Sequence, residues 1–327
     1  MRALVVAIDG GNSKTDAVLV TERGEVLAHV RGPGSSPHRL GADGAARLLD
    51  DLVRELGGRA GARGRLEAAR AEVYLAGADL PAEVAVLRQA VDAAGWAERS
   101  VVDNDGYAIL RAGTGRPDAV AVVCGSGINC VGRAGDGRTS GFPSLGRITG
   151  DWGGGVHVGY EALWHAARAE DGRGEPTALR QAVAAHFGRA TVAEVGEGMH
   201  FGSISERRVA ELSRVLFRAA EDGDRVAAAV VDRLTEEIAL LVAVTLRRLG
   251  LAEAPATAVL GGGVVRAHHD VLVPFVRRRL DERAPKAEIV VVTDPPVLGA
   301  ALYGLDALGA TVSAKRRVAD EVRRLLP

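Results

Sequence analysis

Two segments of the chain place glycines and polar side chains between apolar runs, a combination that suits the binding of an anion. In the first, residues 5–20, the sequence DGGNSKT separates two apolar runs. Glycines let backbone N–H groups approach an anion closely. Ser13 and Thr15 add hydroxyl groups and Lys14 adds a mobile cation. Asp9 ends the first apolar run, where its carboxylate could hold a hydrated magnesium ion that also contacts phosphate.

A simple turn is the structural alternative for this first loop. An isolated Asp-Gly is most often a hairpin signal without chemical meaning. Here the break is longer than a two-residue hairpin needs, and it contains hydrogen-bond donors as well as turn formers. It is neither the GxxxxGK[ST] of a Walker loop nor the GxGxxG of a dinucleotide fold. Alone, the loop is weak evidence.

The pattern recurs later in the chain, which strengthens it. Glycines and a hydroxyl again separate two apolar runs in the segment CGSGIN, residues 124–129, and a glycine triplet follows the run at 257–260. The first two loops could clamp a polyphosphate, and the triplet suits a surface beneath a base and ribose. The predicted nucleotide- and phosphate-binding residues are Gly10, Gly11, Asn12, Ser13, Lys14, Thr15, Gly125, Ser126, Gly127, Gly261, Gly262 and Gly263.

The elements that position these loops follow from hydrophobic periodicity. Strands are predicted at 4–8, 15–20, 25–31, 72–76, 100–103, 119–124, 128–133, 257–260 and 288–292. Helices are predicted at 38–56, 82–94, 107–111, 162–170, 177–186, 225–249 and through the tail 296–326, with loops at 57–64 and 172–174. The 327 residues suffice for two lobes. We expect an N-terminal lobe of residues 1–115, on which the helix at about 297–327 packs back, and a C-terminal lobe of residues 116–296.

Composition narrows the possible partners and location. The chain has 41 Lys and Arg against 42 Asp and Glu, so there is no general attraction to nucleic acid or to an anionic membrane. No apolar run approaches the roughly 20 residues that span a bilayer, and the start lacks a signal-peptide cleavage pattern. We therefore expect a cytoplasmic protein without a nucleic-acid or membrane partner. The two cysteines, Cys124 and Cys130, lie in apolar stretches and are expected to be core residues.

Taken together, these motifs resemble those of the sugar kinase, Hsp70 and actin superfamily. Asp9 to Thr15 is similar to its phosphate-1 loop, Gly125 to Asn129 to its phosphate-2 loop, and Gly261 to Val264 to its adenosine motif. Within the superfamily, the chain resembles the N-acetylglucosamine kinase branch of the BadF/BadG/BcrA/BcrD ATPase family. The motifs occur in order over nearly the whole length: DGGNSKT, GPGSSPHRLG, DNDGYAIL, VVCGSGINCVG, GDWGGG and PPVLGAALYGL.

The resemblance implies an α/β, two-lobed actin-like ATPase (ribonuclease H-like) fold, with mixed sheets flanked by helices and an active site in the interlobe cleft. It implies ATP and Mg²⁺ as cofactors, a homodimer, and transfer of the γ-phosphate to a hydroxyl, the 6-hydroxyl, of an amino sugar such as N-acetylglucosamine or glucosamine. Asp105 matches the family's catalytic aspartate and would act as general base. A helix N-cap is the structural alternative for Asp105, and Asp103 is a close competitor for either role.

On the acceptor side, two positions depart from the family's pattern. Ser36 stands where asparagine is usual, and Trp152 stands where glutamate is usual in the segment that begins Gly150-Asp151. The indole could stack on a sugar face or fill core space. N-acetylglucosamine and glucosamine are the leading acceptors, and another amino sugar or a polyol is the alternative. The predicted acceptor-binding residues are Ser36, Asn104, Asp105, Asn129, Asp151 and Trp152.

Two other classes of function are weighed against a kinase. ATPase activators in the same family hold an iron–sulfur cluster on cysteines, but here both cysteines flank the second phosphate loop and none follows Cys130, which disfavours a cluster. A regulator that binds sugar or nucleotide without catalysis is the second alternative. No helix-turn-helix segment precedes the first loop, and the cysteines of a repressor-type zinc site are missing.

Overall fold

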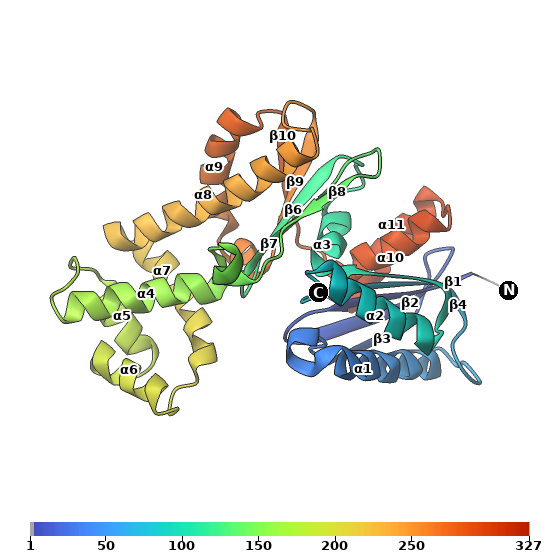
Figure 1. Cartoon of the computed structure of the whole chain (residues 1–327), viewed down its shortest axis with the longest axis horizontal. Coiled ribbons are helices and arrows are strands. Elements are labelled where there is room, and N and C mark those ends of the chain that lie inside the picture. The colour runs from blue at the N-terminus through green and yellow to red at the C-terminus, as the bar shows by residue number, and fades with distance from the viewer. Residues whose placement is uncertain (1–2, 327) are drawn as a thin grey trace. The chain divides into compact units, whose positions relative to one another are not determined.

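The computed structural model describes residues 3–326. The chain divides into two compact units. The first unit comprises residues up to 121 together with those from 292 onward, and the second unit comprises residues 122–291. Each unit contains one five-stranded sheet with helices packed on it (Figure 1). Within residues 3–326, no helix combines the length and apolarity needed to cross a bilayer.

The first sheet combines an antiparallel meander with parallel strands. Its strands are β1 (Leu4–Gly10), β2 (Lys14–Thr21), β3 (Val26–Pro33), β4 (Ala68–Leu75) and β5 (Ala97–Asn104), in the spatial order β3-β2-β1-β4-β5. β1 pairs antiparallel with β2 and parallel with β4, and β4 pairs parallel with β5. The carboxyl ends of β1, β4 and β5 therefore meet at one edge of this sheet.

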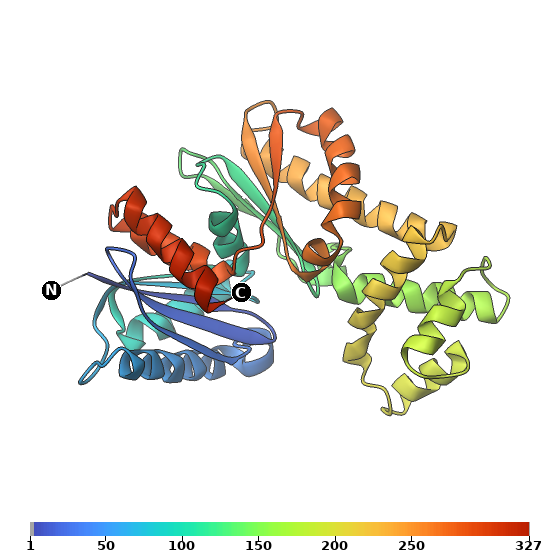
Figure 2. The same cartoon turned by 180° about the vertical axis from the view of Figure 1, so that it is seen from behind.

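Helices cover both faces of the first sheet because its strands are apolar on both sides. Helices α1 (Pro37–Arg59) and α2 (Pro81–Ala94) lie over the face that carries Val6 and Ile8. Helices α3 (Asp105–Gly113), α10 (Pro296–Ala307) and α11 (Val312–Leu325) pack on the face that carries Val5 and Ala7 (Figure 2). The alternation follows from the two-residue period of a strand. It brings the C-terminal helices onto the N-terminal sheet.

The second unit is built around a sheet of order β10-β9-β6-β7-β8. Its strands are β6 (Ala119–Cys124), β7 (Ile128–Arg133), β8 (Thr139–Gly141), β9 (Ala256–Gly261) and β10 (Ala287–Val291). The α-helices are α4 (Gly154–Glu170), α5 (Leu179–His186), α6 (Val192–His200), α7 (Leu212–Glu221), α8 (Arg225–Arg248) and α9 (Gly263–Arg283). Two short 3₁₀ helices, η1 (Gly146–Thr149) and η2 (Glu206–Glu211), complete the unit.

Three predicted boundaries are wrong. Helix α4 begins at Gly154, eight residues before the predicted start at 162. The sequence does not predict this first turn, because its glycines have poor intrinsic helix propensity. The tail is two helices, because Gly309 adopts a left-handed φ of 68° directly after the C-cap of α10. The predicted loop at 57–64 is helical up to Arg59. The other predicted strands and helices occur, with ends that differ by a few residues.

Candidate active site

The first phosphate loop is a closed turn that packs against the segment after β3. The N–H of Gly11 donates to the carbonyl of Lys14 at 2.8 Å, and the N–H of Ser35 donates to the carbonyl of Gly11 at 3.2 Å. A side chain on Gly34 would lie 2.3 Å from the carbonyl oxygen of Asn12. The close approach of the two backbones therefore requires a glycine at position 34.

Thr15 supports this loop from within the unit. Its side chain is buried, and its Oγ1 lies 2.8 Å from the carbonyl oxygen of Pro33 and 2.9 Å from Ser35 Oγ. The hydroxyl is thus engaged with the segment that follows β3. The contact from Thr15 to phosphate stays a prediction.

Lys14 is held at the loop by a buried acid that the sequence reasoning missed. Asp16 is 1% exposed, and Lys14 Nζ lies 3.2 Å from its Oδ2. Arg31 Nε donates to Asp16 Oδ1 at 2.7 Å, and His29 Nε2 lies 3.1 Å from the same oxygen. Burial opposes ionisation of Asp16, but these hydrogen bonds and the charge of Lys14 hold its pKa below the ordinary value. The sequence feature that could have identified Asp16 is an acid inside an otherwise apolar strand.

Two acids with raised pKa values stand at the carboxyl edge of the first sheet. Asp9 is the penultimate residue of β1, and Asp105 follows the last residue of β5. Burial raises the pKa of Asp9 to about 8, aided by the charges of Asp105 and Asp16 and opposed by Lys14. Burial also raises the pKa of Asp105 to about 6, partly offset by the nearby backbone N–H groups at the start of α3. Perturbed carboxyls of this kind suit proton transfer or cation binding.

Asn104, and not Asp105, is the N-cap of helix α3. The Oδ1 of Asn104 accepts the N–H of Gly106 at 2.8 Å, so the expected alternative of Asp105 as N-cap is wrong. Asp105 is the first helical residue. Asp103, its competitor, accepts the N–H of Asn104 at 2.8 Å. Asn104 Nδ2 also donates to Asp79 Oδ1 at 2.7 Å.

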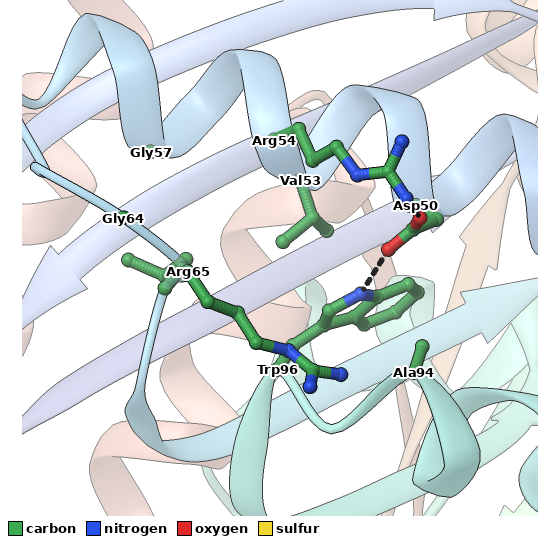
Figure 3. Close-up of a pocket in the computed structure, with 9 residues that line it drawn as sticks. Asp50, Val53, Arg54, Gly57, Gly64, Arg65, Ala94 and Trp96 are labelled. Atoms are coloured by element: carbon green, nitrogen blue, oxygen red, sulfur yellow. Dashed lines mark hydrogen bonds and ion pairs between the residues drawn. The ribbon is translucent and has the colours of Figure 1, made fainter.

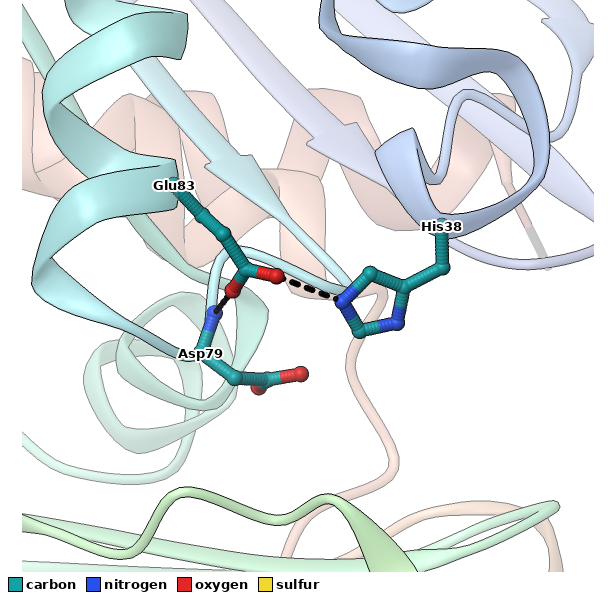
Figure 4. Close-up of side chains that lie close together, drawn as sticks. All are labelled: His38, Asp79 and Glu83. Carbon is teal, nitrogen blue, oxygen red and sulfur yellow. Dashed lines mark hydrogen bonds and ion pairs between the residues drawn. The ribbon is translucent and has the colours of Figure 1, made fainter.

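Ser36 stands among side chains that the sequence reasoning did not connect. It is the N-cap of α1 and is 1% exposed, and its Oγ has no hydrogen-bond partner within residues 3–326. Two residues further on, His38 Nε2 lies 2.9 Å from Glu83 Oε1 (Figure 4). The other oxygen of Glu83 accepts the N–H groups of Asp79 and Leu80 at the start of α2. Asp79 could have been identified from the sequence as an acid shortly after β4, because the end of that strand lies at the edge that carries Asp9 and Asp105.

In the second unit, the start of α4 supports the second phosphate loop. The N–H of Gly155 donates to the carbonyl of Gly125 at 2.8 Å, and the N–H of Val156 donates to the carbonyl of Ser126 at 3.0 Å. A side chain on Gly154 would lie 2.4 Å from the backbone of Gly127. Ser126 and Gly127 are themselves exposed. The loop is therefore fixed from one side, with its hydroxyl on the surface of the unit.

The structure places the glycine triplet beside this loop. Gly262 has a φ of 94°, and a side chain there would lie 2.3 Å from the carbonyl oxygen of Cys124. The turn after β9 therefore lies directly against the end of β6. The start of the predicted second phosphate loop and the predicted adenosine motif, distant in sequence, are therefore neighbours in this unit.

The predicted acceptor residues of the second unit are partly engaged by their own segments. Asp151 Oδ2 accepts the N–H of Gly146 at 3.1 Å and the hydroxyl of Thr149 at 2.5 Å. Asn129 Oδ1 accepts the N–H of Cys130 at 2.6 Å and the hydroxyl of Ser144. These bonds order the two segments. The contacts of Asp151 and Asn129 to an acceptor stay predictions.

Trp152 is half-buried and not a core residue. Its ring is parallel to that of His157, with centroids 6.4 Å apart, and the guanidinium of Arg233 lies 4.1 Å from the ring centroid. A cation over an indole face stabilises its orientation. The stacking of Trp152 on a sugar stays a prediction.

The two cysteines are core residues, as predicted. Both thiols are fully buried, and burial raises the pKa of each to about 12. Cys130 Sγ lies 3.2 Å from Thr245 Oγ1. A protonated, buried thiol is a poor metal ligand, because the thiolate is the ligating form.

A cavity of about 620 Å³ in the first unit contains none of the predicted site residues (Figure 3). Its lining includes Asp50 and Arg54 from α1 and Trp96, the residue before β5. Trp96 Nε1 donates to Asp50 Oδ1 at 2.8 Å. The cavity therefore shares no lining residue with the predicted site.

Comparison with known proteins identifies the family of this chain. Residues 6–304 match the BadF/BadG/BcrA/BcrD ATPase family. The chain belongs to this family. The matched range includes every predicted site residue, from Asp9 to Gly263.

Two relatives of this BadF/BadG/BcrA/BcrD ATPase family chain are named as kinases. An N-acetylmuramic acid/N-acetylglucosamine kinase of Clostridium acetobutylicum is 26% identical over 299 residues, which cover 91% of this chain and 97% of the relative. An N-acetyl-D-glucosamine kinase of Dictyostelium discoideum is 26% identical over 317 residues, covering 93% of this chain and 98% of the relative.

Solved structures with the same fold include sugar kinases. A candidate N-acetylglucosamine kinase from Chromobacterium violaceum matches with a TM-score of 0.70 at 22% identity, over 92% of this chain and 98% of that chain. A glucokinase from Streptomyces griseus, solved with glucose and AMPPNP, matches with a TM-score of 0.55 at 16% identity, over 92% and 99%. This BadF/BadG/BcrA/BcrD ATPase family member therefore has the predicted mixed α/β, actin-like ATPase fold.

Proposed function

We propose that this protein transfers the γ-phosphate of ATP to a hydroxyl of an amino sugar, with N-acetylglucosamine and glucosamine as the leading acceptors. The observation that carries the proposal is the pair Asp9 and Asp105, two carboxyls with raised pKa values at one sheet edge beside a glycine-rich loop. Family membership and the names of both kinase relatives support the same reaction.

Asp105 is the proposed general base. Its pKa of about 6 keeps most of the carboxylate ionised at neutral pH, while leaving it a stronger base than an exposed aspartate. It would accept the proton of the attacking hydroxyl as the new oxygen–phosphorus bond forms. Asn104 fixes the start of α3, and so the position of Asp105, through its bond to Gly106.

Asp9 is the proposed carboxylate of the magnesium site. A carboxyl whose pKa is raised to about 8 by burial and neighbouring acids gains most from a divalent cation. Hard oxygen ligands of this kind fit Mg²⁺, which when bound would neutralise charge on the phosphates. The exposed hydroxyl of Ser126 and the glycines of both loops are proposed to contact the phosphates, with Gly261–Gly263 under the nucleoside.

The alternatives have less support. An iron–sulfur activator requires accessible thiolates, whereas both thiols of this chain are buried and protonated. A kinase acting on another sugar or a polyol would use the same donor residues, and it differs from the proposal only in the acceptor. The homodimer stays a prediction from the resemblance, and the cytoplasmic location stays a prediction from the sequence pattern.

A phosphotransfer screen tests the proposal. Purified protein with ATP and Mg²⁺ is incubated with N-acetylglucosamine, glucosamine, N-acetylmuramic acid, glucose and a polyol, and ADP formation is followed. We expect sugar-dependent ADP formation that is fastest with an amino sugar. ADP formation that does not depend on any acceptor would favour an ATPase and contradict the proposal.

A further inference from the structure

Beside the proposed base, the first unit contains a polar niche formed by Ser36, His38 and Asp79. A side chain on Gly77, which has a φ of 87°, would lie 3.0 Å from Ser36 Oγ and 3.3 Å from His38 Nδ1, so both atoms face the Gly77 backbone. One ligand atom from each of His38, Asp79 and Glu83 lies within 4.8 Å of the others (Figure 4). Asp79 connects the niche to the site through its bond to Asn104, the residue before Asp105.

The polar groups of the niche are mainly hydrogen-bond acceptors. Hydrogen bonds from backbone N–H groups and from His38 hold the pKa of Glu83 below its ordinary value in spite of burial, so this carboxylate is ionised and can only accept. His38 Nε2 must therefore carry the hydrogen that it shares with Glu83, and in the neutral ring Nδ1 is an acceptor. Asp79 adds a carboxylate, and Ser36 adds a buried hydroxyl without a partner in residues 3–326.

The charge around the niche is negative. Asp79, Glu83 and Asp105 contribute carboxyls, and Asp9 lies close enough to Asp105 to be affected by its charge. Two cations of the first unit are engaged elsewhere: Lys14 pairs with Asp16, and Arg39 Nη1 donates to the carbonyl of Asn12 at 2.6 Å.

A metal ion is a less suitable occupant than a hydrogen-bond donor. Both oxygens of Glu83 already accept hydrogen bonds that fix the start of α2 and the ring of His38. A metal ion at Glu83 would compete with those bonds for the carboxylate oxygens. An ammonium group, by contrast, has three donors and no acceptor, and the niche offers Ser36 Oγ, His38 Nδ1 and the Asp79 carboxylate.

We propose that Ser36, His38 and Asp79 bind a protonated amine of the acceptor, so that this kinase prefers a free amino sugar to its N-acetylated form. The inference rests on the proposed function and names the acceptor class. An acetamide offers one N–H and a carbonyl oxygen, and that oxygen would face acceptor atoms and carboxylates. Binding of the acetamide is disfavoured, because a buried acceptor would lose a hydrogen bond and the carbonyl oxygen would be repelled by the carboxylates.

The test compares kcat/KM for glucosamine, N-acetylglucosamine and glucose at neutral pH. The variants are Asp79→Asn, which removes the charge but keeps an oxygen for Asn104, and Ser36→Ala, which removes the unpartnered hydroxyl. Asp92→Asn, an exposed acid that lies on α2 and pairs with Arg88, is the matched control. Melting temperatures of all variants verify that each one folds.

We expect wild type to use glucosamine at least about tenfold better than N-acetylglucosamine, a difference of roughly 1.4 kcal/mol. Asp79→Asn should lower that ratio by about tenfold or more, Ser36→Ala should lower it less, and Asp92→Asn should keep it. Wild type that prefers N-acetylglucosamine would overturn the proposal. So would an Asp79→Asn variant that loses the same factor with every sugar, since Asp79 would then only position Asn104.

Calorimetric titration separates this inference from the proposed function. If no sugar is phosphorylated, the proposed function fails, and glucosamine is then titrated directly into wild type and Asp79→Asn in the presence of a non-hydrolysable ATP analogue. Binding that is weakened tenfold or more by Asp79→Asn supports the niche. Absent binding, or equal affinities, overturns it.

Discussion

Burial and, after it, the charge of Asp105 raise the pKa of Asp9, although Asp9 and Asp105 are 96 positions apart in the sequence. Parallel pairing of β1 with β4 and of β4 with β5 brings the ends of their strands to one edge. Without a bound metal ion, the ionised forms of Asp9 and Asp105 repel each other, so full ionisation of both carboxyls is disfavoured. A divalent cation would relieve the repulsion and free Asp105 to act as a base.

Replacing Asp105 by asparagine should remove the base while conserving shape. We expect kcat to fall by about 10²–10⁴-fold with little change in nucleotide affinity, because Asp105 is proposed to contact the acceptor and not ATP. Steady-state kinetics and fluorescence titration with a nucleotide analogue measure the two effects. Asp51→Asn, at an exposed acid on α1, is the control. Near-wild-type turnover in Asp105→Asn would remove Asp105 from this role.

The pH dependence of catalysis should report on the raised pKa of Asp105. Since the ionised form is the base, kcat/KM should rise with pH and level off above the pKa of about 6. An unshifted aspartate would instead give a plateau from about pH 5 upward. The measurement is a pH–rate profile at saturating Mg²⁺. A flat profile between pH 5 and 7.5 would show that no group with this pKa limits the reaction.

Asp9 should lower the stability of the metal-free protein at high pH and should contribute to magnesium binding. Its pKa is raised from 3.8 to about 8, so the folded protein binds this proton more tightly than the unfolded chain, and stability falls as pH rises between these values. Asp9→Asn should therefore stabilise the metal-free protein at pH 8, by on the order of 1 kcal/mol or more. It should also weaken the magnesium dependence of nucleotide binding.

Melting curves at pH 8 with EDTA, and nucleotide titrations at graded Mg²⁺, test both effects of Asp9→Asn. The exposed Asp51→Asn should change neither. An Asp9→Asn protein that is less stable than wild type, or that has an unchanged magnesium requirement, would count against the metal assignment.

Two adjacent glycines of the triplet should respond differently to alanine. At Gly262 a methyl group would meet the Cys124 carbonyl at 2.3 Å in a backbone with a φ of 94°, whereas at Gly263 no atom lies within 4 Å. We expect Gly262→Ala to destabilise the protein by about 1–3 kcal/mol and Gly263→Ala to have little effect on stability. Denaturant unfolding measures the difference. Equal stabilities would show that Gly262 is not packed against β6.

Local patterns in the sequence predicted much of the fold. The alternating apolar runs of β1 and β2 and the glycine breaks at both phosphate loops depend on neighbours within a few residues. The start of α4 could not be predicted in this way. Its Gly154–Gly155 turn is held by hydrogen bonds to the loop 125–127, which is a tertiary interaction that overrides weak helix propensity.

The acceptor side of the candidate site was the least predictable part. Ser36 and Trp152 were noticed because they depart from a family pattern, whereas Asp79, Glu83 and Asp16 carry no motif. The significance of Asp79 comes from the strand order, which places the residues after β4 beside Asn104. Such contacts depend on pairing between strands that are distant in sequence. Local patterns in a single sequence do not reveal which strands pair.

The most direct test of the proposed reaction is ³¹P NMR of wild type incubated with ATP, Mg²⁺ and either glucosamine or N-acetylglucosamine. The account predicts a new phosphomonoester signal, coupled to the sugar's 6-methylene protons, that grows as ADP forms and is strongly reduced with Asp105→Asn. Inorganic phosphate as the sole product, with either sugar present, would contradict phosphoryl transfer to a sugar hydroxyl.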